Sequence, residues 1–203
     1  MPPRRAAARV DPPRARLDVE ERREQLVALG MELFSQRTYD EVSIDELAQE
    51  AGISKGLLYH YFPTKRDFYI ATVREAARQL LERTATPEGM DPLARLQAGL
   101  DAYIDYVGKH GKPYAALLRS GVGADTEVTK IVDQTRDAFA ARLIEASPAG
   151  AHAPLVRIAL RGWVGFVESS TLEWLVQKKK IDPGVLRTML MKVLVDAVTA
   201  ASL

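Results

Sequence analysis

Apolar residues recur every three to four positions along most of the chain, which is the spacing of an amphipathic α-helix. Glycine, proline and helix-capping residues divide this pattern into segments. We expect helices at about residues 19–36, 43–51, 54–62, 64–84, 92–107, 113–118, 125–144, 155–177 and 183–198. No segment alternates apolar and polar positions convincingly as a strand would, and no repeat is visible. The pattern therefore predicts an all-α fold of about nine helices.

Two short helices joined by a tight turn make residues 43–62 the most informative stretch. Ser43 and Glu46 fit a capping box, in which the hydroxyl and the carboxylate each accept a hydrogen bond from a free backbone N–H. Gly52 is placed to end the first helix, because glycine enters the left-handed conformation without a steric penalty. Ser54 can cap the second helix. Such a pair at a steep angle is a helix-turn-helix, which places its second helix in the DNA major groove, although ordinary helical bundles contain capped pairs as well.

The outward side of the second helix offers groups that can hydrogen-bond phosphates or base edges. Lys55 supplies a cation, Tyr59 a phenol and His60 an imidazole. Lys65 lies in the first turn of the next helix, where free N–H groups and the helix dipole attract a phosphate. The alternative for Lys65 is an ordinary solvated lysine. We expect DNA contacts from Ser43, Ser54, Lys55, Gly56, Tyr59, His60, Tyr61 and Lys65.

The segment SKGLLYHYFPTKRDFY resembles the recognition helix and the following segment of the TetR family of bacterial transcriptional regulators. The family pattern is Lys/Arg-Gly-x-Leu-Tyr-x-x-Phe-x-x-Lys, and this chain matches it with Lys55, Gly56, Leu58, Tyr59, Phe62 and Lys65. The specific match extends from about residue 18 to residue 69. Pro63 departs from the family, where a polar residue is common, but it falls between two helices and should be tolerated.

The resemblance implies an organisation for the whole chain. It predicts a helix-turn-helix DNA-binding domain at residues 18–66 and a ligand-binding and dimerisation domain at residues 67–203. It further implies a homodimer formed through the last two long helices, a palindromic double-stranded DNA operator, and a repressor that a small ligand releases. From periodicity alone, the last two helices are too apolar to leave one side in water, and a buried core explains that as well as a subunit interface does.

Residues 1–17 are rich in proline, arginine and alanine, with five arginines and one aspartate. The prolines oppose regular helix, so we expect a flexible basic arm. Such an arm could reach phosphates or the minor groove beside the recognition helix. A solvated tail with no DNA contact fits the composition equally well.

The expected ligand is mainly apolar, because the fifth to eighth helices carry many aliphatic and aromatic side chains. The candidate ligand-binding residues are Tyr103, Tyr106, Tyr114, Arg119, Phe139, Trp163 and Glu168. An aromatic residue at helical spacing is more often part of a core, which is the alternative for each of them. The charged exceptions in this part are Arg119, Arg136, Arg161 and Glu168, and one of them, if it faces inward, would select the ligand's polar group.

Composition narrows the function classes further. The chain has 203 residues, 47% of them hydrophobic, a net charge of +1 and no cysteine. It therefore has no disulfide framework and no thiolate metal site, and any DNA binding must be local. The three histidines are far apart and fit no metal-ligand pattern. No segment is apolar and long enough for a membrane span, and no signal-peptide core is present, so we expect a cytoplasmic protein.

No pair of acidic residues or nucleophile stands out, so nothing in the sequence favours an enzyme, and no cofactor is expected. Two other classes remain. One is a helical protein–protein adaptor whose basic N-terminal face binds an acidic partner. The other is a TetR-like regulator controlled by a partner protein rather than by a small molecule.

Overall fold

The computed structural model describes residues 19–87, 89–111, 114–115, 125–146, 154–177 and 180–202. Within these ranges the chain forms eight α-helices and no strand: α1 (Val19–Phe34), α2 (Ile44–Glu50), α3 (Lys55–Tyr61), α4 (Lys65–Arg83), α5 (Pro92–Lys109), α7 (Thr126–Ala146), α8 (Pro154–Val176) and α9 (Pro183–Ala201). The predicted all-α fold is confirmed. The basic arm expected at 1–17 lies outside the described residues, and the short helix expected at 113–118 lies mostly outside them.

The helices begin where the capping residues predicted. Ser43 and Glu46 form both hydrogen bonds of the capping box at the start of α2. Thr64 accepts from the Asp67 N–H at the start of α4. Asp91 and Asp182 cap α5 and α9 in the same way, each followed by a proline in the first turn, where the missing N–H of proline is not needed.

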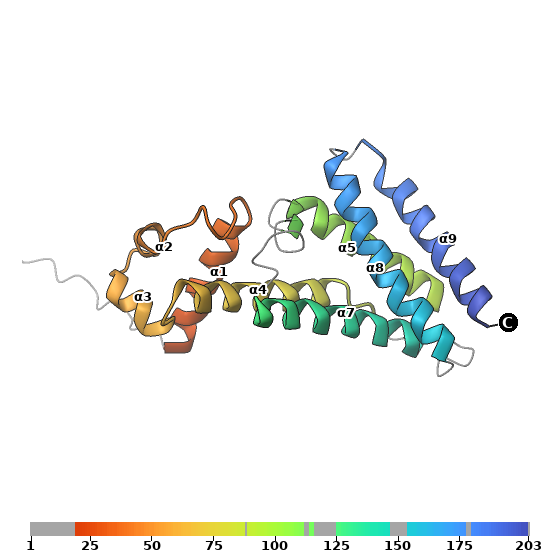
Figure 1. Ribbon diagram of the computed structural model, residues 1–203, viewed down its shortest axis with the longest axis horizontal. Helices are drawn as coiled ribbons and strands as arrows, with labels where there is room; N and C mark the ends of the chain where they lie inside the picture. Colours follow the sequence, from red (N-terminus) through yellow and green to blue (C-terminus); the bar gives the residue numbers. More distant parts are fainter. Residues whose placement is uncertain are drawn as a thin grey trace, which may run out of the picture.

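The molecule is elongated, with α1, α2 and α3 at one end and α8 and α9 side by side at the other (Figure 1). Helices α4 and α7 pack against each other and run between the two ends. The expected boundary between residues 66 and 67 falls in the first turn of α4. None of the described helices is long and apolar enough to cross a membrane.

Two hydrophobic cores lie at the two ends. The headpiece core, as we call the first, comprises Leu26, Val27, Phe34, Val42, Ile44, Leu47, Ala48, Leu58, Phe62, Phe68, Tyr69, Ile70, Val73, Val128 and Ile131. Side chains of α4 lie against the α1 backbone at Gly30, where a Cβ would lie 2.7 Å from the Phe68 ring. The second core joins α5, α8 and α9, and the Trp163 indole N–H donates to the Leu190 carbonyl across α8 and α9 at 2.8 Å.

Two residues of the headpiece core come from α7, far along the chain. Val128 is completely buried and Ile131 is 6% exposed. An ion pair at the surface reinforces this junction: Arg66 of α4 contacts both carboxylate oxygens of Asp125, with Nη2 to Oδ1 at 2.8 Å. Asp125 also accepts from the Glu127 N–H at the start of α7. The three N-terminal helices are therefore held by α7 as well as by α4.

Candidate functional site: a nucleic-acid interface and a cavity

The turn between α2 and α3 has the geometry that the sequence predicted. Gly52 has a φ of 63°, in the left-handed region that favours glycine. The Ile53 N–H donates to the Ala48 carbonyl at 3.0 Å, and the Leu57 N–H donates to the Ser54 hydroxyl at 3.2 Å. These bonds close the end of α2 and cap α3, so the orientation of α3 is fixed by local contacts.

One side of α3 is buried and the other faces solvent. Leu58 is completely buried and Phe62, which follows the helix, is 2% exposed. The solvent side presents Ser54, Lys55, Gly56, Tyr59 and His60, and Ser43 is exposed at the start of α2. Leu57 is also exposed, at 40%, although its apolar side chain gave no reason to expect a contact with DNA. The exposed side therefore carries a cation, a phenol and an imidazole, groups that can hydrogen-bond phosphates or base edges.

Besides the capping hydroxyls of Ser43 and Ser54, three further candidate DNA contacts are engaged within the protein. Lys55 Nζ pairs with an Asp45 carboxylate oxygen at 2.9 Å. Lys65 Nζ lies 4.1 Å from the centroid of the Tyr39 ring, a cation–π contact that places its charge at the start of α4. The Tyr61 side chain is half-buried against the headpiece core. Lys65 is thus more constrained than the solvated lysine that was its alternative.

Glu46 of α2 forms hydrogen bonds with the loop that precedes this helix. Glu46 accepts from the Arg37 guanidinium at 3.0 Å and from the Ser43 N–H at 3.0 Å. The hydrogen bond from Arg37, followed by those from Ser43, lowers the pKa of Glu46 to about 2 from an ordinary value of 4.5. Because the folded-state pKa lies below the unfolded one, the charged form contributes stability that is fully present above about pH 4.5 and is lost as the pH falls towards 2.

We expect Glu46→Gln to lower the midpoint of thermal unfolding at pH 7 but to have progressively less effect as the pH falls from 5 to 3. Glutamine keeps an oxygen for the Ser43 N–H but loses the charge that Arg37 contacts. Melting curves of both proteins across this pH range measure the difference. A difference that is independent of pH would show that the Glu46 charge adds nothing to stability.

A cavity of about 410 Å³ lies among α4, α5, α7 and α8. Its volume falls within the range of about 300–1,000 Å³ that is typical of small-molecule sites. Six of the seven candidate ligand-binding residues line it: Tyr103, Tyr106, Tyr114, Phe139, Trp163 and Glu168. The seventh, Arg119, lies outside the described residues. Aliphatic side chains such as Val73, Leu80 and Val167 form much of the remaining wall.

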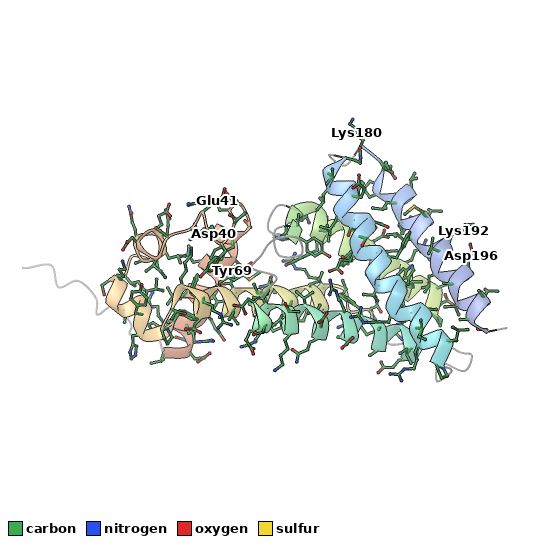
Figure 2. The ribbon with its side chains drawn as sticks, in the orientation of Figure 1. Asp40, Glu41, Tyr69, Lys180, Lys192 and Asp196 are labelled. Atoms are coloured by element: carbon green, nitrogen blue, oxygen red, sulfur yellow. The ribbon has the colours of Figure 1, made fainter. Side chains whose placement is uncertain are left out.

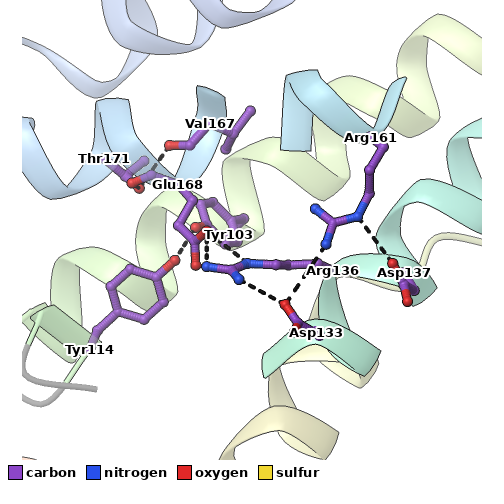
Figure 3. A network of polar contacts seen from close by, with 9 residues as sticks. All are labelled: Tyr103, Tyr114, Asp133, Arg136, Asp137, Arg161, Val167, Glu168 and Thr171. Carbon is purple, nitrogen blue, oxygen red and sulfur yellow. Dashed lines mark hydrogen bonds and ion pairs between the residues drawn. The ribbon is translucent and has the colours of Figure 1, made fainter. Parts of the chain in front are cut away.

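An ion pair between α7 and α8 forms part of the cavity wall (Figure 3). Arg136 Nη2 lies 2.6 Å from Glu168 Oε2, and Arg136 Nη1 lies 2.9 Å from Asp133 Oδ1. Arg161 instead pairs with Asp137 at 3.0 Å and does not line the cavity. The two charged candidates that face inward, Arg136 and Glu168, therefore already satisfy each other.

Two tyrosines supply neutral hydroxyl groups beside this ion pair. The phenol oxygens of Tyr103 and Tyr114 are hydrogen-bonded to each other (Figure 3). Burial raises the pKa of Tyr103 to about 12, and burial likewise raises the pKa of Tyr114. Both phenols therefore stay protonated at neutral pH and can donate or accept a hydrogen bond.

The cavity wall also contains residues that the sequence analysis missed, chiefly Arg95, Arg142, Thr84 and Thr86. They lie at or near helix ends, where polar side chains are usually solvated, so no local signal marks them. Among the described residues, no group of three or more His, Cys, Asp or Glu side chains could hold a metal ion.

Two family models match the chain. The model described as bacterial regulatory proteins, tetR family, matches residues 26–72. The model described as tetracyclin repressor-like, C-terminal domain, matches residues 92–200. The first range includes α2 and α3 and the second includes most of the cavity wall.

Known proteins match over most of their length. The crystal structure of a tetR-family transcriptional regulator from Streptomyces coelicolor is 34% identical and superimposes with a TM-score of 0.81, covering 91% of this chain and 83% of that chain. The HTH-type transcriptional activator FasR of Mycolicibacterium smegmatis is 28% identical over 171 residues, 82% of this chain and 78% of that protein. The HTH-type transcriptional repressor KstR of Rhodococcus jostii is 24% identical over 163 residues, which cover 78% of this chain and 75% of that protein.

Proposed function

The chain belongs to the TetR family of bacterial regulatory proteins and is a DNA-binding transcriptional regulator, and from this premise we propose that it is a homodimeric repressor released by a small ligand. In this proposal the two α3 helices of a dimer enter successive major grooves of a palindromic operator in the cytoplasm. The relatives include a transcriptional activator and a transcriptional repressor. We favour repression with release because the DNA-binding end and the cavity share one helix.

The proposed ligand switch is supported by the position of α4, which extends from the recognition helix to the cavity. Its first turn follows the recognition helix and contains Lys65, and its later turns place Val73, Ala76 and Leu80 in the cavity wall. A ligand that displaces these side chains tilts α4 and changes the spacing of the two recognition helices. A hundredfold loss of operator affinity requires a ligand to prefer the DNA-incompetent state by about 2.7 kcal/mol. The cavity also favours a small molecule over control by a partner protein.

The DNA contacts that we propose are those of the exposed side of α3, namely Ser54, Lys55, Gly56, Tyr59 and His60, together with Ser43, Tyr61 and Lys65. Tyr59 and His60 point away from the headpiece core and offer hydrogen bonds to bases or phosphates. Lys55 would contact DNA while it remains paired with Asp45. The pairing also neutralises the Asp45 carboxylate, which would otherwise repel the phosphates. This pairing supports a positioning contact rather than base recognition.

The proposed dimer uses exposed apolar side chains of α8 and α9. On α8, Ile158 is 68% exposed and Phe166 39%, while a Cβ built at Gly162 or Gly165 would meet nothing within 4 Å. On α9, Val185, Met189 and Val195 are similarly exposed. Charged groups such as Lys192 and Asp196, which pair with each other at 3.3 Å, project from α9 as well (Figure 2). A partner's pair of helices would bury the apolar stripes in a four-helix bundle.

The proposed function is tested by fluorescence anisotropy of labelled DNA from upstream of the gene. We expect saturable binding at one palindromic site by a dimer, and release when a compound that fills the cavity is added. A protein that binds every DNA of equal length alike would not be an operator-specific regulator.

We expect Lys65→Ala to weaken operator binding and to reduce the slope of log K against log salt concentration by about one unit, as for one lost phosphate contact. The matched control is Lys109→Ala, which removes a lysine that pairs with Asp105 on α5. It should leave affinity and slope unchanged. An unchanged slope in Lys65→Ala would mean that the lysine serves only its contact with Tyr39.

A further inference from the structure

Three arginines line the cavity, and they differ in whether a carboxylate neutralises their positive charge. Arg136 pairs with Asp133 and Glu168. Arg95 and Arg142, both half-buried, form no ion pair with any carboxylate of the described residues. A partly buried guanidinium without a counter-charge is unfavourable, because it loses hydration without gaining an opposite charge. The Arg142 guanidinium lies 5.8 Å from the centroid of the Phe139 ring, a contact that does not neutralise its charge.

The only hydrogen bonds that the described part of the chain provides to these two guanidinium groups come from threonine hydroxyls. Arg95 Nε donates to Thr86 Oγ1 at 3.2 Å, and Arg142 Nη1 donates to Thr84 Oγ1 at 3.1 Å. Each guanidinium has five N–H donors, so most of them remain available. Glu145 also lines the cavity, but among the described residues it forms no ion pair with either arginine.

The two arginines sit at one end of the cavity. Arg95 is in the first turn of α5, Arg142 is near the end of α7, and the threonines lie where α4 ends. Tyr103, which lies beside the Arg136–Glu168 pair, follows Arg95 by eight residues on α5, which corresponds to about 12 Å along the helix axis. The space between these two ends is bordered by apolar groups, among them Leu96, Leu100, Phe139 and Leu143.

From this arrangement we propose that the ligand of the cavity is an amphipathic anion, with its negatively charged head bound by Arg95 and Arg142 and its apolar chain directed towards Tyr103 and Trp163. The head is a carboxylate or a phosphate, since both accept paired hydrogen bonds from guanidinium groups. At the Tyr103 end of the cavity, Arg136 is already engaged by Glu168 and Asp133, so it is not available to a ligand head group, and the apolar tail is the part of the ligand that fits there. This inference rests on the proposed ligand switch and specifies the chemical class of its ligand.

Probes that share one chain and differ in head group test the proposal. Isothermal titration would compare decanoate, decyl phosphate, decanol and decyltrimethylammonium on the wild-type dimer. We expect one or both anions to bind about tenfold or more tightly than decanol, and the cation to bind least. The stronger anion identifies the head group.

Substitutions then locate the anion. Arg95→Gln and Arg142→Gln should each weaken binding of the stronger anion about tenfold and leave decanol binding within about twofold. The control Arg157→Gln removes an exposed arginine of α8 that is not in the cavity wall.

The possible results distinguish the anionic head group from the apolar ligand. Equal binding of decanoate, decyl phosphate and decanol, or variants that bind the anions as the wild type does, overturn the anionic head while an apolar ligand remains. No binding of any probe overturns both the anionic head and the apolar ligand. Operator binding by the same preparations without probe tests the regulator itself.

Discussion

Phe166→Glu should convert the protein to a monomer and reduce operator affinity by about 10²- to 10⁴-fold, the range by which a second linked contact raises binding. Phe166 is 39% exposed on α8 beside Gly162 and Gly165, whose surfaces are open. In the proposed interface the charge would be buried against a partner's apolar stripe, and each protomer would then hold only one half-site.

Light scattering coupled to size exclusion measures the mass, which should fall to one chain of 22.5 kDa. The matched control is Leu93→Glu, which places the same charge at an apolar side chain that is 55% exposed on α5. It should remain a dimer with normal operator affinity. A wild-type monomer that binds the operator tightly, or a Phe166→Glu dimer, would contradict the proposed interface.

Gly56→Ala should weaken operator binding about tenfold or more without lowering the melting temperature. In the free protein a Cβ at position 56 lies in open space, 4.0 Å from Ser54 Oγ, and alanine is favoured over glycine in a helix by about 1 kcal/mol. The free fold should therefore be as stable as before or slightly more stable. On the operator, the methyl group would stand between the α3 backbone and the DNA.

Thermal melting and operator titration of the same preparation measure the two effects. Their opposite direction distinguishes a DNA contact from a structural defect, which would lower both quantities. Unchanged operator affinity would show that the DNA does not approach the α3 backbone at Gly56, and would move the interface towards Tyr59 and His60.

The helix boundaries within residues 43–65 could be predicted from the sequence because each depends on residues close to it in the chain. A capping hydroxyl at Ser43, a left-handed glycine at Gly52 and a cap at Ser54 act within one turn of chain, and all three are present in the structure. The contact of Lys65 with Tyr39 was not predicted, because it depends on how the 38–42 loop returns to α4.

Further along the chain, periodicity could not separate a core from an interface. Leu190 is completely buried, whereas its neighbour Met189 is 43% exposed, yet both are apolar residues of one helix. Aromatic residues expected at the ligand do line the cavity, since large side chains at the inner faces of several helices meet there. Arg95 and Arg142 were missed because only the convergence of α4, α5 and α7 turns these helix-end residues inward.

Because two α7 residues belong to the headpiece core, the N-terminal helices of this chain cannot be moved to another protein as an independent DNA-binding module. A chimaera that joined residues 19–72 to a foreign regulatory domain would lose Val128 and Ile131 and leave the headpiece core incomplete. Deleting a buried aliphatic side chain costs about 2–5 kcal/mol, a large part of the stability of a small domain. Redirecting the protein to another operator therefore requires either transferring residues 125–131 along with the headpiece or changing only the exposed side of α3.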